Sequence, residues 1–203
     1  MSREPAYIRD FKEFTRGDLT FMDLPILELE MYGQKNDRAT AVILGSIVES
    51  SLVHLLKGIL RPDLNSDARR ILFDYEGPIG TFSAKTALAF ALGLIGPISK
   101  HDLDLIRLLR NEFAHSRRSF SFETKVAANV CLQLQTPNTP DFYIPHGYLS
   151  AAAEHGMTRA DDPTFPRTRY IATCHALAYR ILQRAENTKG FAGLIENMPH
   201  APP

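Results

Sequence analysis

The sequence predicts an all-α protein, a compact multi-helix bundle with a long, irregular, proline-rich insertion. Apolar residues recur three and four positions apart along several segments, which is the spacing of one face of an α-helix. Glycine and proline residues separate these segments. With 203 residues, of which 44% are hydrophobic, the chain can bury one substantial core.

We expect three parts along the chain. Residues 1–36 alternate charged residues with apolar clusters and predict an N-terminal arm or short helix that packs on the main body. Residues 37–188 are expected to form the helical bundle domain, with the insertion at 136–167. Residues 189–203 are expected to be a C-terminal tail.

The first long helix is expected from Asp37 to Leu60. Asp37 can cap its N-terminus, and Pro62 stops it. The expected buried face consists of Ala41, Leu44, Ile47, Val48, Leu52, Leu55, Leu56 and Ile59.

A short helix around residues 67–73 leads into Gly77-Pro78-Ile79-Gly80. The backbone N–H groups of such a segment could bind an anion, but the Gly-Lys-Ser/Thr ending of a phosphate-binding loop is missing. We therefore interpret this segment as a tight turn between helices.

Residues 83–115 predict an αα-hairpin. Its first helix runs over 83–95, is ended by Gly96-Pro97, and has the expected apolar face Ala84, Leu88, Ala91, Leu92 and Ile95. Its second helix has Ser99 as N-cap, Asp102 and Asp104 near the positive end of the dipole, and reaches about His115. The expected buried stripe of this second helix is Leu103, Ile106, Leu109 and Phe113.

The remaining helices are separated by the insertion. Residues 122–134 show a weaker helical pattern, and the segment 136–167 holds five prolines and is expected to be mostly irregular. The last strong helix is expected over 168–188, with Ile171, Cys174, Ala178 and Ile181 on one face.

The charge balance limits the classes of partner. Lys plus Arg and Asp plus Glu number 23 each, so the overall field does not draw the protein to DNA, RNA or an acidic membrane. The sequence has no helix-turn-helix with a basic recognition helix, and we do not expect direct DNA binding. Any contact with nucleic acid must be local.

Cysteine usage and hydropathy predict a cytoplasmic protein. Cys131 and Cys174 lie in helical segments without metal-ligand spacing and are expected to be buried thiols. The N-terminus has no apolar signal region, and no later stretch approaches the roughly 18 uninterrupted apolar residues of a membrane span. The histidines show no paired metal-binding spacing, so neither a metal nor another cofactor is expected.

The segment from Arg110 to His115 is the strongest candidate for chemistry. On a helix, Arg110, Asn111 and His115 lie within an arc of roughly 140°, and Arg107 precedes Asn111 by four residues on the same side. Metal-independent RNA cleavage needs a group that titrates near neutral pH, a permanent cation and a neutral hydrogen bonder. His115, Arg110 and Asn111 could fill these roles in turn.

A purely structural alternative stays open for the same residues. Arginine and histidine near a helix C-terminus complement its negative end, and Asn111 could bond a nearby backbone carbonyl.

Two further polar features could support binding. Glu49 lies beside three serines in the first long helix and could meet Arg110 across the bundle and orient it, or belong to a solvated face. Arg117 and Arg118, followed by Phe120 and Phe122, could bind RNA, or form a solvated basic turn before a buried phenylalanine.

Three sequence stretches, GPIGTFSAKTALAFALGLI, DLDLIRLLRNEFAHS and SFSF, resemble the core of the bacterial mannitol-operon repressor family. The helix that contains Glu49 also resembles the first core helix of that family. The similarity covers about residues 38–125 well and the last helix loosely. It implies a compact helical bundle and a negative regulator of gene expression without a conventional DNA-binding element.

The Arg110-Asn111-x3-His115 pattern also resembles the signature of HEPN domains, helical dimers in toxins and defence systems. In that family the arginine and histidine form a metal-independent ribonuclease site. Some relatives in the mannitol-repressor family depart at the asparagine position, but this chain has the complete pattern.

The two resemblances imply two hypotheses. The first is a non-enzymatic regulator, a homodimer that binds a regulatory protein partner through the exposed surface of the bundle and the proline-rich insertion. The second is an endoribonuclease in which Arg110 and His115 of two subunits line one dimer cleft, Asn111 orients them and Glu49 supports them. RNA would then be the substrate and a cognate antitoxin the partner.

Overall fold

The computed structural model describes residues 36–60, 63–139 and 165–188, and every regular element in these ranges is helical. The elements are α3 (Asp37–Ile59), α4 (Ser66–Phe73), α5 (Phe82–Ala91), α6 (Pro97–His115), α7 (Lys125–Cys131), the 3-10 turn η1 (Thr136–Asn138) and α9 (Pro166–Thr188). The predicted all-α bundle is confirmed. The expected N-terminal arm, the C-terminal tail and most of the insertion lie outside the described residues, so the division into these parts stays a prediction.

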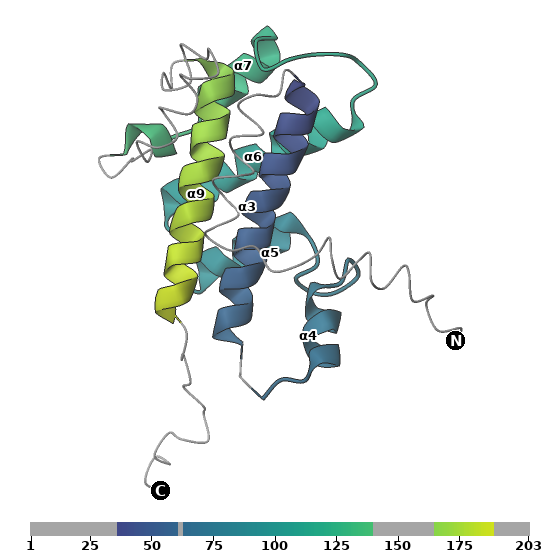
Figure 1. The fold of residues 1–203 in the computed structure, drawn as a ribbon, viewed down its shortest axis with the longest axis vertical. Coiled ribbons are helices and arrows are strands. Elements are labelled where there is room, and N and C mark those ends of the chain that lie inside the picture. Colours follow the sequence, from purple (N-terminus) through teal and green to yellow (C-terminus); the bar gives the residue numbers. More distant parts are fainter. Residues whose placement is uncertain (1–35, 61–62, 140–164, 189–203) are drawn as a thin grey trace, which may run out of the picture.

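The longest helices, α3 and α9, lie side by side, and α5 and α6 pack against α3 (Figure 1). The predicted buried face of α3 is confirmed from Ala41 to Leu56, and Ile59 packs at the edge of the core. By length and composition alone α3 could cross a membrane, but half of its apolar window is buried by the rest of the fold. Its apolar character is therefore accounted for by its central position in the bundle.

The N-terminus of α3 differs from the prediction. Asn36 is the N-cap, and its Oδ1 accepts a hydrogen bond from the Ala39 N–H at 3.1 Å. The Asp37 carboxylate instead accepts from the Phe122 N–H and from Arg167 Nε, each at 2.9 Å. Asp37 thus connects three segments of the fold, which is why it is not available as the cap.

Aromatic rings fill the core where α6, the following loop and α9 meet. Phe113 stacks on Phe120 with ring centroids 4.3 Å apart, and Phe122 lies between Phe113 and Tyr170. The fully buried Tyr170 donates to the Ala41 carbonyl at 2.9 Å. Burial raises the Tyr170 pKa well above its usual value, so the hydroxyl keeps the proton that this hydrogen bond needs.

The predicted αα-hairpin is present, but its turn was placed wrongly. Helix α5 ends at Ala91, and Gly93 follows with φ of 67°, a left-handed conformation that favours glycine. Gly96 and Pro97 do not end α5 but begin α6, because proline fits the first helical position, where its missing N–H is not needed. Ser99 consequently lies inside α6 rather than at its cap.

The buried face of α5 was also predicted wrongly. The buried residues are Phe82, Lys85, Thr86 and Ala89, whereas Ala91 and Leu92 are exposed. The helix is apolar on almost every side, so the apolar pattern could not select a face. The two polar residues can be buried because Thr86 bonds the Phe82 carbonyl and Lys85 reaches polar partners outside α5.

The predicted stripes of α6 and α9 are confirmed, and both cysteines are buried free thiols, as expected. The helix α7 is shorter than the predicted 122–134 segment, and α9 begins at Pro166 rather than Thr168.

The Gly77–Gly80 segment is a tight turn, as predicted. A Cβ atom at Gly77 or Gly80 would clash with backbone oxygens of Ile71 or Asp74. The N–H groups of Gly77, Ile79 and Gly80 bond to the carbonyls of Asp74, Leu72 and Gly77. These three N–H groups are therefore occupied within the turn and not directed at an anion.

A buried carboxylate joins α6 to the segment that follows α7. Asp102 is fully buried, and its oxygens accept from the Gln135 N–H, the Thr136 N–H and His101 Nδ1 at 2.6–3.0 Å. Arg169 of α9 holds the same segment by donating to the Leu134 carbonyl and to Asn138. The prediction that Asp102 acts at the helix dipole missed this connection, because the Gln135 and Thr136 N–H groups lie more than thirty residues away in the sequence.

We predict that Asp102→Ala lowers the free energy of unfolding by about 3 kcal/mol, because the buried Thr136 N–H and the part-buried Gln135 N–H lose their acceptor. The matched control is Asp104→Ala, which removes a carboxylate that is 39% exposed and pairs with Lys100. Its cost should stay below about 1 kcal/mol. Urea unfolding followed by circular dichroism measures both, and equal losses would contradict the role assigned to Asp102.

We also predict that Cys131 resists thiol reagents in the native protein. Burial, with smaller contributions from Glu123 and Asp37, raises its pKa from 9.0 to about 12, so the thiol stays protonated at pH 8. An Ellman assay at pH 8 should show no reaction of Cys131 until denaturant is added. Rapid reaction in the native state would contradict the described packing.

Candidate functional site

Two of the predicted site residues, Arg110 and Asn111, meet Glu49 across the bundle. The Arg110 Nη2 donates to Glu49 Oε2 at 3.1 Å, and Arg110 Nη1 donates to Asn111 Oδ1 at 3.0 Å. The guanidinium is thus held on one side by a carboxylate of α3 and on the other by its neighbour on α6. The predicted meeting of Glu49 with Arg110 is present in the structure.

The same carboxylate binds a second cation that the sequence analysis did not select. Lys85 of α5 donates from Nζ to Glu49 Oε1 at 2.8 Å and to the Gly80 carbonyl at 2.7 Å. Its side chain is only 5% exposed, and that of Glu49 is 18% exposed. Glu49 therefore joins α3, α5 and α6, and Lys85 connects this ion-pair cluster to the tight turn before α5.

A glycine makes room for the cluster. A Cβ at Gly45 would lie 2.8 Å from Arg110 Cγ and 2.9 Å from Arg110 Cβ, closer than real Cβ contacts come. Gly45 is one helical turn before Glu49, so the Arg110 side chain crosses α3 at Gly45 and reaches Glu49. The helices can approach this closely only because residue 45 has no side chain.

The electrostatics of the cluster determine what it can do. One carboxylate faces two permanent cations, which leaves a net positive charge, and the Arg110 side chain is 29% exposed. An anion could approach the exposed part of the guanidinium, but it would compete with Glu49 for the same N–H groups. The arrangement is suited to holding helices together and, secondarily, to presenting an oriented cation at the surface.

His115 is not part of this cluster. It is the last residue of α6, is exposed, and forms no hydrogen bond or ion pair within the described ranges. Arg107 is half-buried, and its Nε has no hydrogen-bond partner among the described residues. Arg117 and Arg118 are exposed on the loop after α6, and Phe122, which follows them, is fully buried.

Lys85 and Gly45 could have been found from the sequence by a different argument. Lys85 lies three residues after Phe82 and four before Ala89, so it shares their helix face. A lysine on the buried face of a helix needs an anionic partner, and Glu49 is a carboxylate within an otherwise apolar helix. Because the expected buried face lay on the opposite side of α5, Lys85 was not among the predicted site residues.

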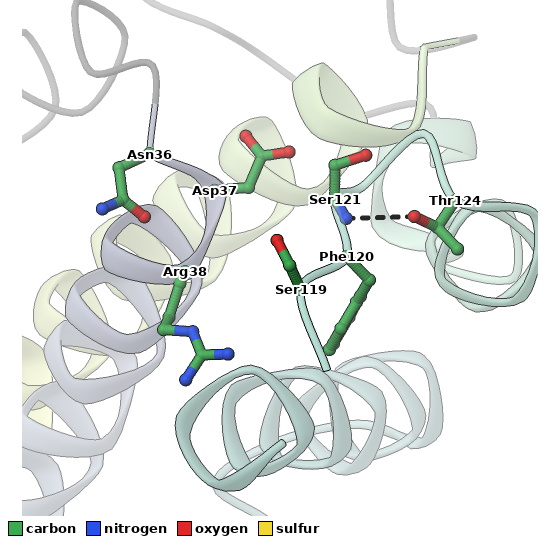
Figure 2. Close-up of a pocket in the computed structure, with 7 residues that line it drawn as sticks. All are labelled: Asn36, Asp37, Arg38, Ser119, Phe120, Ser121 and Thr124. Carbon is green, nitrogen blue, oxygen red and sulfur yellow. Dashed lines mark hydrogen bonds between the residues drawn. The ribbon is translucent and has the colours of Figure 1, made fainter. Parts of the chain in front are cut away.

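A separate cavity of about 750 Å³ lies between the first turn of α3 and the loop before α7 (Figure 2). Its lining residues are Asn36, Asp37, Arg38, Ser119, Phe120, Ser121 and Thr124. Arg38 donates to the backbone carbonyls of Ser116 and Arg118, which fixes the loop against α3. The loop contains Arg117, Arg118 and Phe120, which the sequence indicated as a possible RNA-binding segment, but no sequence pattern predicts a cavity there.

Among known proteins, the chain is similar in structure to a solved protein, although its sequence matches no family model. Neither a protein-family model nor a curated protein sequence matches the chain. A solved structure that is similar is the X-ray structure of the MtlR–HPr complex from Escherichia coli, with a TM-score of 0.59 and 20% sequence identity. The match covers 79% of this chain and 99% of that chain. The chain therefore has an MtlR-like fold, which agrees with the sequence resemblance to mannitol-operon repressors.

The close approach at Gly45 predicts that alanine changes the free energy of unfolding differently at the two positions Gly45 and Gly58 of α3. Gly45→Ala should lower the free energy of unfolding by about 2 kcal/mol, because its Cβ would displace Arg110. Gly58→Ala should be neutral or stabilise by up to about 1 kcal/mol, since its Cβ would lie 4.0 Å from the Ala185 carbonyl oxygen and alanine favours helix. Chemical denaturation measures both, and a stable Gly45→Ala protein would contradict the packing of Arg110 on α3.

Proposed function

We propose that this chain is a mannitol-repressor-like regulatory protein, a negative regulator of gene expression that acts through protein contacts. The observation that carries the proposal is the MtlR-like fold, which extends over 99% of the matched MtlR chain. That relative is seen in complex with another protein, HPr. A protein partner is therefore the kind of ligand we propose for this chain.

The ion-pair cluster supports a non-enzymatic role. A catalytic arginine must be able to bind the phosphate as charge develops, but the Arg110 guanidinium is occupied by Glu49 and Asn111. His115 does not contact it within the described residues. In a regulator these residues need only stabilise the bundle, and the observed contacts are sufficient for that.

The surface supports action through protein contacts. Formal charge is balanced over the whole chain, which disfavours unassisted binding to DNA. Large apolar side chains are exposed where α5 leads into α6: Phe90 is 39% exposed, Leu92 51% and Ile98 42%. Exposed apolar residues close together in the chain are typical of protein interaction surfaces. We propose that the protein works as a homodimer and with a regulatory protein partner in the cytoplasm.

A HEPN-type endoribonuclease is the second candidate, and one observation favours it. Glu49 and Asn111 orient the Arg110 guanidinium, which is the supporting role that the ribonuclease hypothesis assigned to them. In that case RNA would displace part of the Glu49 contact, and His115 of a second subunit would complete the site. Arg110 and His115 would be the catalytic residues.

A repression assay tests the first candidate. The wild-type chain, produced in a host that lacks its own mannitol repressor, should lower expression of a reporter gene driven by a mannitol-operon promoter several-fold. His115→Ala should repress as well as the wild type, because the imidazole is exposed and forms no hydrogen bond or ion pair within the described residues. Repression that depends on His115 would contradict a non-enzymatic mechanism.

Cleavage of an end-labelled mixed-sequence RNA in EDTA tests the second candidate. A regulator should leave the RNA intact at stoichiometric protein concentration. Cleavage by the wild type that is lost in both Arg110→Ala and His115→Ala, with helicity retained, would establish the ribonuclease instead. Arg184→Ala is a suitable control, since Arg184 is an exposed arginine of α9 outside the ion-pair cluster.

A further inference from the structure

The cavity between the first turn of α3 and the 119–124 loop has a size and lining that suit a small polar ligand (Figure 2). Its volume of about 750 Å³ lies within the range of roughly 300–1,000 Å³ typical of small-molecule sites. Figure 2 shows that Arg38 projects from α3, whereas Ser119 and Ser121 come from the loop. Two separate segments therefore form its walls.

The lining offers hydrogen-bond donors in excess. The Arg38 guanidinium donates from Nη2 to the carbonyls of Ser116 and Arg118, and its Nε and Nη1 form no hydrogen bond with the described residues. The hydroxyls of Ser119 and Ser121 and the amide nitrogen of Asn36 form no hydrogen bonds within the described residues. A ligand that fits these groups must be rich in acceptor oxygens.

The one carboxylate in the lining is already paired with a cation. One oxygen of Asp37 pairs with Arg167 Nε at 2.9 Å, and the other accepts from the Phe122 N–H. The Arg167 guanidinium therefore compensates the negative charge of Asp37. Arg38 is the lining cation that is left to attract an anion.

An aromatic ring completes the lining. Phe120 is half-buried, stacks on Phe113 at 4.3 Å between centroids, and lines the cavity. The stack holds the ring in one position, so a planar group can pack on it without the cost of ordering a mobile side chain. A cation, several donors and a fixed ring in one cavity match a phosphate joined to an aromatic base.

From these features we infer that the cavity binds a mononucleotide, with its phosphate at Arg38 and the donors of Ser119 and Ser121, and its base at Phe120. This site is separate from the Glu49 cluster, and the inference does not depend on the regulatory function proposed above. It assigns a role to Arg38 and Phe120 that neither candidate function uses.

Isothermal titration calorimetry of the full chain with AMP, ribose 5-phosphate and adenosine tests the inference. AMP should bind in a saturable manner, and each of the other two should bind at least about tenfold more weakly, because ribose 5-phosphate lacks the base and adenosine lacks the phosphate. Ser119→Glu should weaken AMP binding at least about tenfold, since it places a carboxylate in the cavity. Ser119 is exposed, and its hydroxyl forms no hydrogen bond within the described residues, so the fold should tolerate the change. Gln183→Glu adds the same charge to an exposed position of α9 and should bind AMP as the wild type does.

Three results would overturn the inference. The first is no saturable binding of AMP at millimolar concentration. The second is equal binding by Ser119→Glu and the wild type, which would place the nucleotide elsewhere. The third is equally tight binding of ribose 5-phosphate, which would remove the role of Phe120 and with it the nucleotide. Thermal unfolding of Ser119→Glu, expected to match the wild type, shows that any loss of binding is not a loss of fold.

Discussion

The two ion pairs of the Glu49 carboxylate, with Lys85 and with Arg110, are the interactions on which the rest of the bundle depends. The two carboxylate oxygens hold Lys85 of α5 and Arg110 of α6, so a single side chain of α3 fixes two neighbouring helices. Lys85 is almost fully buried, and a buried ammonium without a partner would be strongly destabilising. Around this cluster the apolar residues of α3 and α9 form the core, and the turn at Gly80 is tied in through its carbonyl.

This constraint also shapes the functional argument. Arg110, the cation of the HEPN-like motif, connects α6 to α3 in the structure, and Gly45 provides the space that this connection needs. The same contacts would pre-orient Arg110 if a phosphate displaced part of the Glu49 interaction. The Arg110-Asn111-x3-His115 motif alone therefore does not separate a regulator from a ribonuclease. The regulator is favoured because the Arg110 guanidinium is occupied by Glu49 and Asn111, and because His115 forms no hydrogen bond or ion pair within the described residues.

The sequence predicted those features of the structure that depend on residues within one helix, and it missed those that depend on contacts between residues far apart in the chain. The all-α class and the buried faces of α3, α6 and α9 followed from the spacing of apolar residues, which can be recognised in the sequence of a single helix. The buried face of α5 could not be predicted in this way, because the burial of Lys85 depends on the Glu49 carboxylate, thirty-six residues away. Asp102 was misassigned for the same reason, since its partners lie beyond α7. The cavity at Arg38 combines two distant segments, and no sequence spacing indicates it.

A double-mutant cycle between Glu49 and Arg110 tests most directly whether their contact stabilises the fold. Glu49→Gln, Arg110→Gln and the double variant would be compared with the wild type by urea unfolding. We predict a coupling free energy of about 1 kcal/mol or more, because the two side chains are largely shielded from water and bond directly. A coupling below about 0.3 kcal/mol would contradict the account and would leave Arg110 free for another role.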